Sequence, residues 1–293
     1  MEACGGSRFI GRALREQGHG VRLMPAQYVK PYVKTNKNDY IDAEACAEAV
    51  TRPRMRFVPI KSDDQLDLQS LHRVRERWMV RRTAVINQIR GMLLERGITI
   101  AKGRRHIEES LPGILEDADN KLSGGLRVLL HELRLEMQYL HRQIEQSNKL
   151  IDRIAGELEQ CKHLLTVPGI GPITATATVA AIGNGAAFKK GRGFAAWIGA
   201  VPGERSTGGK QKLTRTSRRG NKYLRKLFVQ GAHVVLLQRR KQASGLRMWL
   251  DKLVSRKPKQ VATVALANKM ARIAWAVLSK GEPYRPPLAA QAA

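Results

Sequence analysis

Two acidic residues, Asp39 and Asp42, lie three positions apart where a predicted helix begins, in the segment 38–44. Residues at that spacing project from one face of a helix, so the two carboxylates could share a divalent cation. Acids in a first turn also suit the helix dipole and N-capping, and taken alone this interpretation is the stronger one. A third acid, Glu2, stands in the segment 2–6, which fits a strand end followed by a glycine turn and a helix.

A candidate nucleophile, Ser206, lies in the glycine-rich segment 202–210 between Arg205 and Lys210. A serine hydroxyl at this place could attack a phosphodiester, because the neighbouring cations would stabilise charge that develops on the phosphoryl oxygens. The sequence places no histidine nearby to act as the base. A turn serine that bonds to its own backbone is the ordinary alternative, and spacing alone does not decide between the two.

A second glycine turn, Pro168-Gly169-Ile170-Gly171, stands between an apolar helix end and a predicted helix of small residues. Such a turn can direct backbone N–H groups at a phosphate, as in helix-hairpin-helix DNA-binding modules. A glycine that only ends a helix is the alternative. The surrounding positive charge favours phosphate contact.

Positive charge is the strongest compositional signal. The chain has 293 residues, 52 Lys and Arg against 25 Asp and Glu, and a formal net charge of +27. The segment 189–259 alone holds 20 of these cations and two acids, together with aromatic residues. This pattern predicts a surface that follows nucleic-acid phosphates, whereas a membrane-surface helix is disfavoured because the charges also fall on glycine-rich loops. The predicted contacts are Arg205, Lys210, Arg215, Arg218 and Arg219.

Composition also limits the cellular setting and the metal chemistry. No apolar run approaches the roughly 20 residues that cross a bilayer, and the first residues lack the pattern of a signal peptide. The three cysteines, Cys4, Cys46 and Cys161, are far apart and suit a reducing compartment. The cysteines and the seven histidines show no zinc-ligand spacing, so a bound metal would be a hard cation held by carboxylates. We expect a soluble cytoplasmic protein, associated with the nucleoid and without a membrane partner.

The predicted elements divide the chain into parts. Short helical and extended signals alternate at the start, with a helix at 8–17 and a buried strand at 21–24. Apolar residues then recur at three-and-four spacing over 64–97 and again over 126–158, which predicts two long helices with a coiled-coil seam. The intervening segment, 101–122, contains Pro112-Gly113 and is predicted to be the turn of a helical hairpin. Such a hairpin could space domains, form dimers or simply pack as core.

The last part is predicted to be a compact, all-helical domain that ends with an alanine-rich helix over about 260–278. The final residues are expected to be a loose tail. The predicted domains are 1–60, 61–160, 161–283 and a tail at 284–293.

In its order of motifs, nearly the whole chain resembles the insertion sequence 110 family of transposases. The similarity rests on Glu2, Asp39 and Asp42, the helical hairpin, the turn 167–171, and the segments 197–202, 206–210 and 217–221. The resemblance implies a RuvC-like domain with an Asp-Glu-Asp-Asp set that binds Mg²⁺, and a C-terminal domain that supplies a nucleophilic serine. Glu2, Asp39 and Asp42 then match the last three acids, and Ser206 matches the serine.

The implied fold is mostly α, with a partial α/β N-terminal domain of the RuvC or RNase H type. A long helical hairpin and an all-α C-terminal domain with a helix-hairpin-helix-like element complete it. In the family the first acid lies on a strand upstream of the glutamate, whereas this chain begins one residue before Glu2. We therefore expect an N-terminally truncated member that lacks the first Asp, through a misassigned start or the decay of the copy.

The implied activity is transposition of an insertion sequence by magnesium- and serine-dependent strand exchange. The resemblance also implies a guide RNA, and a homo-oligomer in which the serine of one subunit meets the carboxylates of another; the helical hairpin is the expected contact. Two alternatives belong to other classes. A RuvC-like nuclease would cut with metal-activated water and would not need Ser206. A non-catalytic DNA-binding remnant would need neither the acids nor the serine.

Overall fold

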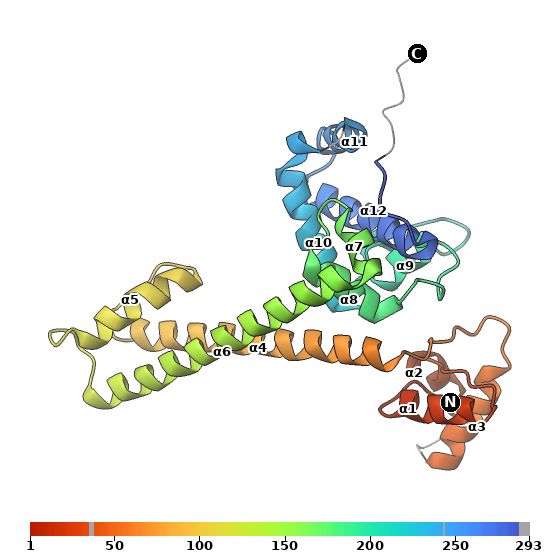
Figure 1. Cartoon of the computed structure of the whole chain (residues 1–293), viewed down its shortest axis with the longest axis horizontal. Coiled ribbons are helices and arrows are strands. Elements are labelled where there is room, and N and C mark those ends of the chain that lie inside the picture. The colour runs from red at the N-terminus through yellow and green to blue at the C-terminus, as the bar shows by residue number, and fades with distance from the viewer. Residues whose placement is uncertain (35–37, 243, 287–293) are drawn as a thin grey trace.

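The structure is a computed structural model that describes residues 1–34, 38–242 and 244–286. Most of these residues are helical, and they form three successive parts: a small N-terminal unit, a long helical hairpin and a C-terminal unit (Figure 1). The prediction of a mostly α fold is confirmed.

The N-terminal unit packs short helices around a few backbone bridges. Its elements are α1 (Ser7–Glu16), α2 (Ala26–Val29), the 3-10 turn η1 (Lys30–Tyr32) and α3 (Asp39–Val50). Glu2 forms a parallel bridge with Met24, and Leu23 forms an antiparallel bridge with Val58. Helix α1 therefore connects two parallel segments, as in a strand-helix-strand unit. The strand predicted at 21–24 is reduced to these bridges, although Leu23 and Met24 are buried as expected.

The helical hairpin consists of α4 (Asp63–Leu94), α5 (Arg104–Glu116) and α6 (Gly124–Glu157) (Figure 1). The two long helices predicted from apolar spacing are thus confirmed. The buried residues of α6 that keep the three-and-four spacing are Leu130, Met137, Leu140, Ile144, Ser147 and Ile151. Ser147, the polar interruption of this seam, donates its hydroxyl hydrogen to the carbonyl of Gln143 at 2.8 Å. The hydroxyl is therefore satisfied inside an apolar contact.

The prediction that 101–122 is a simple turn is wrong, because helix α5 occupies most of it and includes Pro112. A proline inside a helix removes one backbone hydrogen bond and crowds the preceding turn. Ile107 and Leu111 of α5 are completely buried in the cluster formed with α4 and α6. Tertiary packing of this apolar face outweighs the unfavourable proline.

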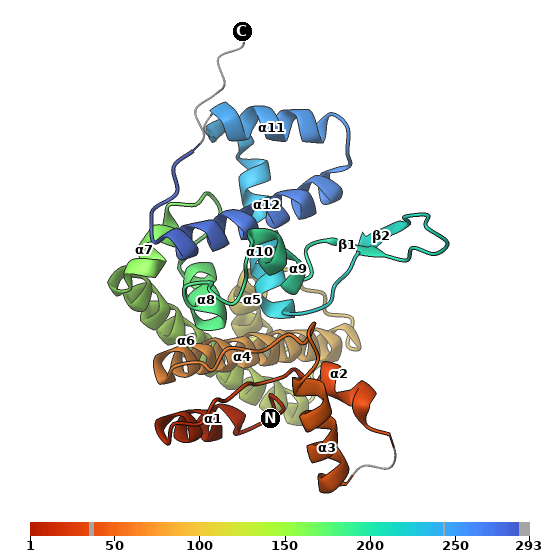
Figure 2. The same cartoon turned by 90° about the vertical axis from the view of Figure 1, so that its right-hand side faces the viewer.

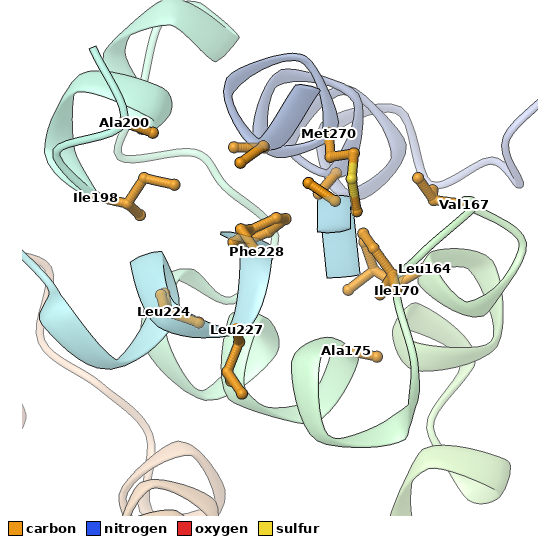
Figure 3. Close-up of a cluster of buried hydrophobic side chains, with 14 of the residues drawn as sticks. Leu164, Val167, Ile170, Ala175, Ile198, Ala200, Leu224, Leu227, Phe228 and Met270 are labelled. Carbon is orange, nitrogen blue, oxygen red and sulfur yellow. The ribbon is translucent and has the colours of Figure 1, made fainter. Parts of the chain in front are cut away.

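The C-terminal unit surrounds the largest hydrophobic core of the molecule. Its helices are α7 (Glu159–Leu165), α8 (Pro172–Ile182), α9 (Gly191–Trp197), α10 (Lys222–Leu237), the 3-10 turn η2 (Arg239–Lys241), α11 (Ser244–Val254) and α12 (Lys259–Lys280). Leu164, Ile170, Phe228 and Met270 point into one interior from α7, the turn after it, α10 and α12 (Figure 3). Helix α12 confirms the predicted final helix.

The prediction that the C-terminal part is all-helical is wrong. Strand β1 (Pro202–Glu204) pairs antiparallel with β2 (Leu213–Thr216), and the connecting loop extends away from the helices (Figure 2). The segment is rich in glycine and threonine, which are weak helix formers. Gly208 and Gly209 have φ angles of 55° and 73°, and two consecutive residues with positive φ favour a tight hairpin.

Buried polar contacts fix α4 against the C-terminal unit. The ammonium of Lys61 donates to the carbonyl of Ala180 at 2.6 Å, and the side chain of Gln65 donates to the carbonyl of Val179 at 3.1 Å. Burial lowers the pKa of Lys61 to about 8, and the nearby guanidinium of Arg8 contributes. These contacts place the start of the hairpin on the end of α8.

Within the described ranges, α12 is the one helix long and apolar enough to cross a membrane. It is also a core helix, since Leu266, Met270 and Ala274 are buried against the C-terminal unit. We therefore attribute the apolar residues of α12 to its position in the hydrophobic core. The three cysteines are free thiols, and burial raises the pKa of Cys161 to about 12.

Candidate nucleic-acid interface and reactive serine

Ser206 lies in the loop of the β1–β2 hairpin, exposed to solvent. The segment from Thr207 to Lys210 closes the loop, and the N–H of Lys210 donates to the carbonyl of Thr207 at 3.0 Å. The hydroxyl of Ser206 donates to Oε1 of Glu204 at 2.5 Å and accepts the backbone N–H of Lys212 at 3.3 Å. The β1–β2 hairpin thus holds the hydroxyl of Ser206 beside the carboxylate of Glu204.

A large groove begins at the base of this hairpin, where β2 meets α9, α11 and α12. Its volume is about 1630 Å³, and its described lining residues include six cations and no acid. The cations are Lys190, Arg192, Arg215, Arg218, Lys269 and Arg272. Such a set of unopposed cations attracts a polyanion and suits a phosphate backbone.

Aromatic side chains accompany these cations. The ammonium of Lys269 lies 4.4 Å from the ring centroid of Trp249, and Trp275 lines another part of the groove. Partial burial lowers the pKa of Lys269, and the neighbouring charge of Arg272 adds to this effect. The two cations repel each other, so an anion bound between them would relieve the repulsion.

Arg218 has an unusual backbone conformation. Its φ of 55° makes it the one non-glycine residue with positive φ in the part of the chain that the structure describes. A residue held in this region costs about 1 kcal/mol or more, and such strain is often concentrated at functional sites. The following residue, Arg219, offers its carbonyl to the guanidinium of Arg225 at 3.2 Å. The loop is therefore fixed to α10 while Arg218 lines the groove.

The structure brings together only some of the predicted nucleic-acid contacts. Arg215 and Arg218 share the groove, whereas Arg205 and Lys210 belong to the exposed hairpin loop. Lys190 and Arg192 belong to the basic segment 189–259 but were not among the individually predicted contacts. Sequence reasoning missed Lys269 and Arg272, which lie outside that segment, and it missed Glu204 as the partner of the serine. The three-residue spacing of Lys269 and Arg272 on a predicted helix was the available signal.

Close packing explains why residue 169, in the turn at 168–171, is a glycine. A Cβ on Gly169 would stand 2.6 Å from Cγ2 of Val235 and 2.8 Å from the carbonyl oxygen of Gly231. Ile170 is a core residue, and Gly171 is exposed with nothing within 4 Å of a Cβ placed on it. Phosphate contact by this turn, which begins with the half-buried Pro168, stays a prediction, and Gly171 is its accessible member.

The three predicted acids lie in the N-terminal unit. The side chain of Asn38 accepts the N–H groups of Tyr40 and Ile41 and caps α3, so the first-turn acids Asp39 and Asp42 do not serve as the cap. Glu2 stands on the bridge to Met24. The described residues form no group of three or more His, Cys, Asp or Glu side chains that could hold a metal. Glu2, Asp39 and Asp42 therefore do not converge as a metal-binding set.

Comparisons with known proteins agree over both ends of the chain. Residues 161–246 match the family described as "Transposase IS116/IS110/IS902 family", and residues 2–97 match a transposase domain of the DEDD type. A "Probable family 20 transposase" from Pseudomonas aeruginosa is 45% identical over 98% of this chain and 85% of that protein.

Two other relatives are transposases of named insertion sequences. The "Transposase for insertion sequence element IS1111A" from Coxiella burnetii is 39% identical over 97% of this chain and 78% of its own length. The "Transposase for insertion sequence element IS1328" from Yersinia enterocolitica is 40% identical over 97% of this chain and 84% of its own length.

Proposed function

Because this chain belongs to the IS110 family of transposases, we propose that it moves an insertion sequence by strand transfer with Ser206 as the nucleophile. The observation that carries this proposal is the position of Ser206. Its hydroxyl is exposed on a projecting hairpin, bonded to a carboxylate, and the same hairpin leads into a groove lined by cations.

The groove is proposed to hold the DNA backbone. Six cations without an acid favour phosphates over any neutral ligand. They come from three places in the chain: the start of α9, β2 with the loop after it, and α12. A duplex bound there would extend toward the hairpin loop, where Arg205 and Lys210 flank the serine. Attack of the serine oxygen on a phosphate would leave the DNA covalently attached to the protein until a second strand displaces it.

The DEDD class of transposase domains implies a divalent metal ion, generally Mg²⁺. Glu2, Asp39 and Asp42 do not converge here into a metal-binding set, so their assignment as metal ligands stays a prediction. No step of the proposed serine chemistry passes through the metal. The chain's own contribution, as proposed, is to bind DNA, to expose Ser206 and to surround it with positive charge.

A guide RNA and a homo-oligomer also remain proposals. The excess of cations would bind RNA phosphates as well as those of DNA.

The proposed homo-oligomer rests on the helical hairpin. This hairpin exposes large apolar side chains, among them Val80, Val128, Leu129 and Tyr139, and such residues suit a contact with another copy. Light scattering after size exclusion measures the oligomer. A monomer at micromolar concentration, with or without nucleic acid, would contradict the oligomer proposal.

The direct test is a search for the covalent intermediate. The full chain is incubated with Mg²⁺, RNA transcribed from its own element and DNA that carries the joined element ends, and denaturing gels then separate protein-linked DNA. We expect an adduct in the unaltered protein and none in Ser206→Ala. An adduct that persists in Ser206→Ala would assign the nucleophile elsewhere, with Thr207 and Ser217 the next candidates. Cleavage without any adduct would support a nuclease that uses water.

A further inference from the structure

The carboxylate of Glu204 is the acceptor for the hydroxyl hydrogen of Ser206. Glu204 ends β1, and the N–H of the next residue, Arg205, donates to the carbonyl of Lys212 at 2.9 Å, so the first loop residues stay paired and Ser206 lies beside Glu204. Their hydrogen bond is 2.5 Å long, and the N–H of Lys212, the residue just before β2, donates to the serine oxygen at 3.3 Å. The serine oxygen is thus oriented by one donor and one acceptor.

The contact between Glu204 and Ser206 lies in a part of the chain where cations greatly outnumber acids. Glu204 is one of two acids in the segment 189–259, and the other, Asp251, pairs with Arg239 at 3.1 Å. Among the described residues Glu204 makes no ion pair within 4.0 Å, although Arg205, which follows it directly, carries a positive charge. The carboxylate contacts the serine hydroxyl instead of a cation.

We propose that Glu204 is a catalytic residue that takes the proton of Ser206 during attack on the DNA phosphate. This inference rests on the proposed function of Ser206. As the bond between the serine oxygen and phosphorus forms, the O–H bond breaks and the proton passes to Glu204. The bond from phosphorus to the leaving DNA oxygen breaks, and that oxygen takes a proton from water. The hydroxide so produced is neutralised by the proton on Glu204.

The first test separates proton transfer from positioning. Glu204→Gln keeps an oxygen that can accept the serine hydrogen bond but cannot take up the proton. General-base catalysis contributes about 100-fold or more, so the rate of adduct formation should fall by about that factor. The matched control is Glu282→Gln, which removes one exposed carboxylate after α12 and should leave the rate unchanged.

The outcomes distinguish this inference from the proposed function. If Ser206→Ala abolishes the adduct while Glu204→Gln forms it at the normal rate, Glu204 is not the base and the serine proposal stands. If the adduct persists in Ser206→Ala, or if the unaltered protein forms none, both the serine proposal and the inference are wrong.

The second test measures the contact without recombination. In Ser206→Cys, a neighbouring carboxylate raises the pKa of the introduced thiol, because a negative charge disfavours the thiolate. Adding Glu204→Gln should therefore increase the rate at which iodoacetamide alkylates this thiol in the folded protein at neutral pH by severalfold. The alkylated fraction is measured by mass spectrometry of the peptide that carries residue 206, after digestion. Cys4, which is also exposed, serves as the internal reference. Equal rates with and without Glu204 would overturn the inference.

Discussion

Two glycine-rich segments of the C-terminal unit look alike in sequence and differ in structure. The turn at 168–171 packs between α10 and α12, where a Cβ on Gly169 would meet the backbone of Gly231. The hairpin loop, by contrast, has nothing within 4 Å of a Cβ placed on Gly208 or Gly209. Glycine serves close packing in the first segment and turn geometry in the second.

This difference indicates where reactive chemistry belongs. A turn that is needed for packing cannot change without loss of the fold, whereas a loop without core contacts can approach a ligand freely. The proposed nucleophile, Ser206, lies in the open loop. Ile170, in the packed turn, belongs to the core. Four experiments test the contrast, in order of decreasing expected effect.

The largest effect is expected from filling the packed turn. In Gly231→Ala the new Cβ would stand 2.1 Å from the carbonyl oxygen of Gly169, and Gly169→Ala adds backbone strain at φ 81°. Each change should lower the free energy of unfolding by about 3 kcal/mol. Urea denaturation followed by circular dichroism measures it. The control, Gly171→Ala, should unfold at nearly the same urea concentration. If Gly169→Ala is equally stable, the packing account fails.

A similar loss is expected on acidification, through His72. Its ring bonds to Thr176 of α8 and to Tyr223 of α10, each at 3.0 Å, and burial lowers its pKa to about 4. The unfolded chain therefore binds this proton first, and stability present above pH 6.5 is lost as the pH falls toward 4. The loss attributable to this group is about 3 kcal/mol.

Urea denaturation at pH 7 and pH 4.5 reads out this effect. Replacing His72 with glutamine should flatten the pH dependence in this window. His131→Gln, at an exposed position on α6, should leave it unchanged. Acid should thus loosen α8, the helix that follows the packed turn, from α4. A steep acid loss that persists in the His72 variant would assign it to other groups.

A smaller effect is expected in the groove beside the open loop. Lys269→Gln and Arg272→Gln should each weaken binding to a labelled DNA duplex of random sequence about fivefold to tenfold, and reduce the slope of log affinity against log salt by about 1. Fluorescence anisotropy at several salt concentrations measures both values. Lys280→Gln removes a cation from the exposed end of the same helix and should change little. Equal slopes in all three variants would contradict a DNA backbone in the groove.

The smallest effect on stability is expected in the open loop itself. Gly208→Ala strains a residue at φ 55°, but the loop has no core contacts and can open locally. The melting temperature should change by about 1 °C or less, while adduct formation falls because the serine loses its partners. Gly208→Asn should retain activity, since asparagine tolerates this backbone region. A large fall in melting temperature would show that the two segments do not differ as described.

The sequence predicted the long helices well because their burial is periodic. The apolar spacing over 64–97 and 126–158 comes from one buried face along each helix, and the structure confirms α4 and α6 there. Helix α5, within the predicted turn 101–122, was missed because Pro112 signals a local break, and only the burial of Ile107 and Leu111 by other helices compensates for it.

The candidate site was less predictable, because it depends on distant segments. Lys269 and Arg272 lie outside the basic segment 189–259 and join Arg215 only through tertiary folding. The packing demand on Gly169 comes from Gly231, more than 60 residues away along the chain. Glu204 was overlooked as a partner because its two-residue spacing from the serine brings the two side chains together only through the backbone conformation at the end of β1.

The short spacing between Glu204 and Ser206 has a consequence for how copies of such a gene lose activity. A single residue, Arg205, separates the two side chains and is paired through its N–H to the carbonyl of Lys212, so the insertion or deletion of one residue here would move the serine away from the carboxylate. Substitutions at exposed neighbours such as Gln211 would leave this spacing unchanged. Among diverging copies, the length of this segment should therefore separate active lineages from silent ones better than its amino-acid identity does.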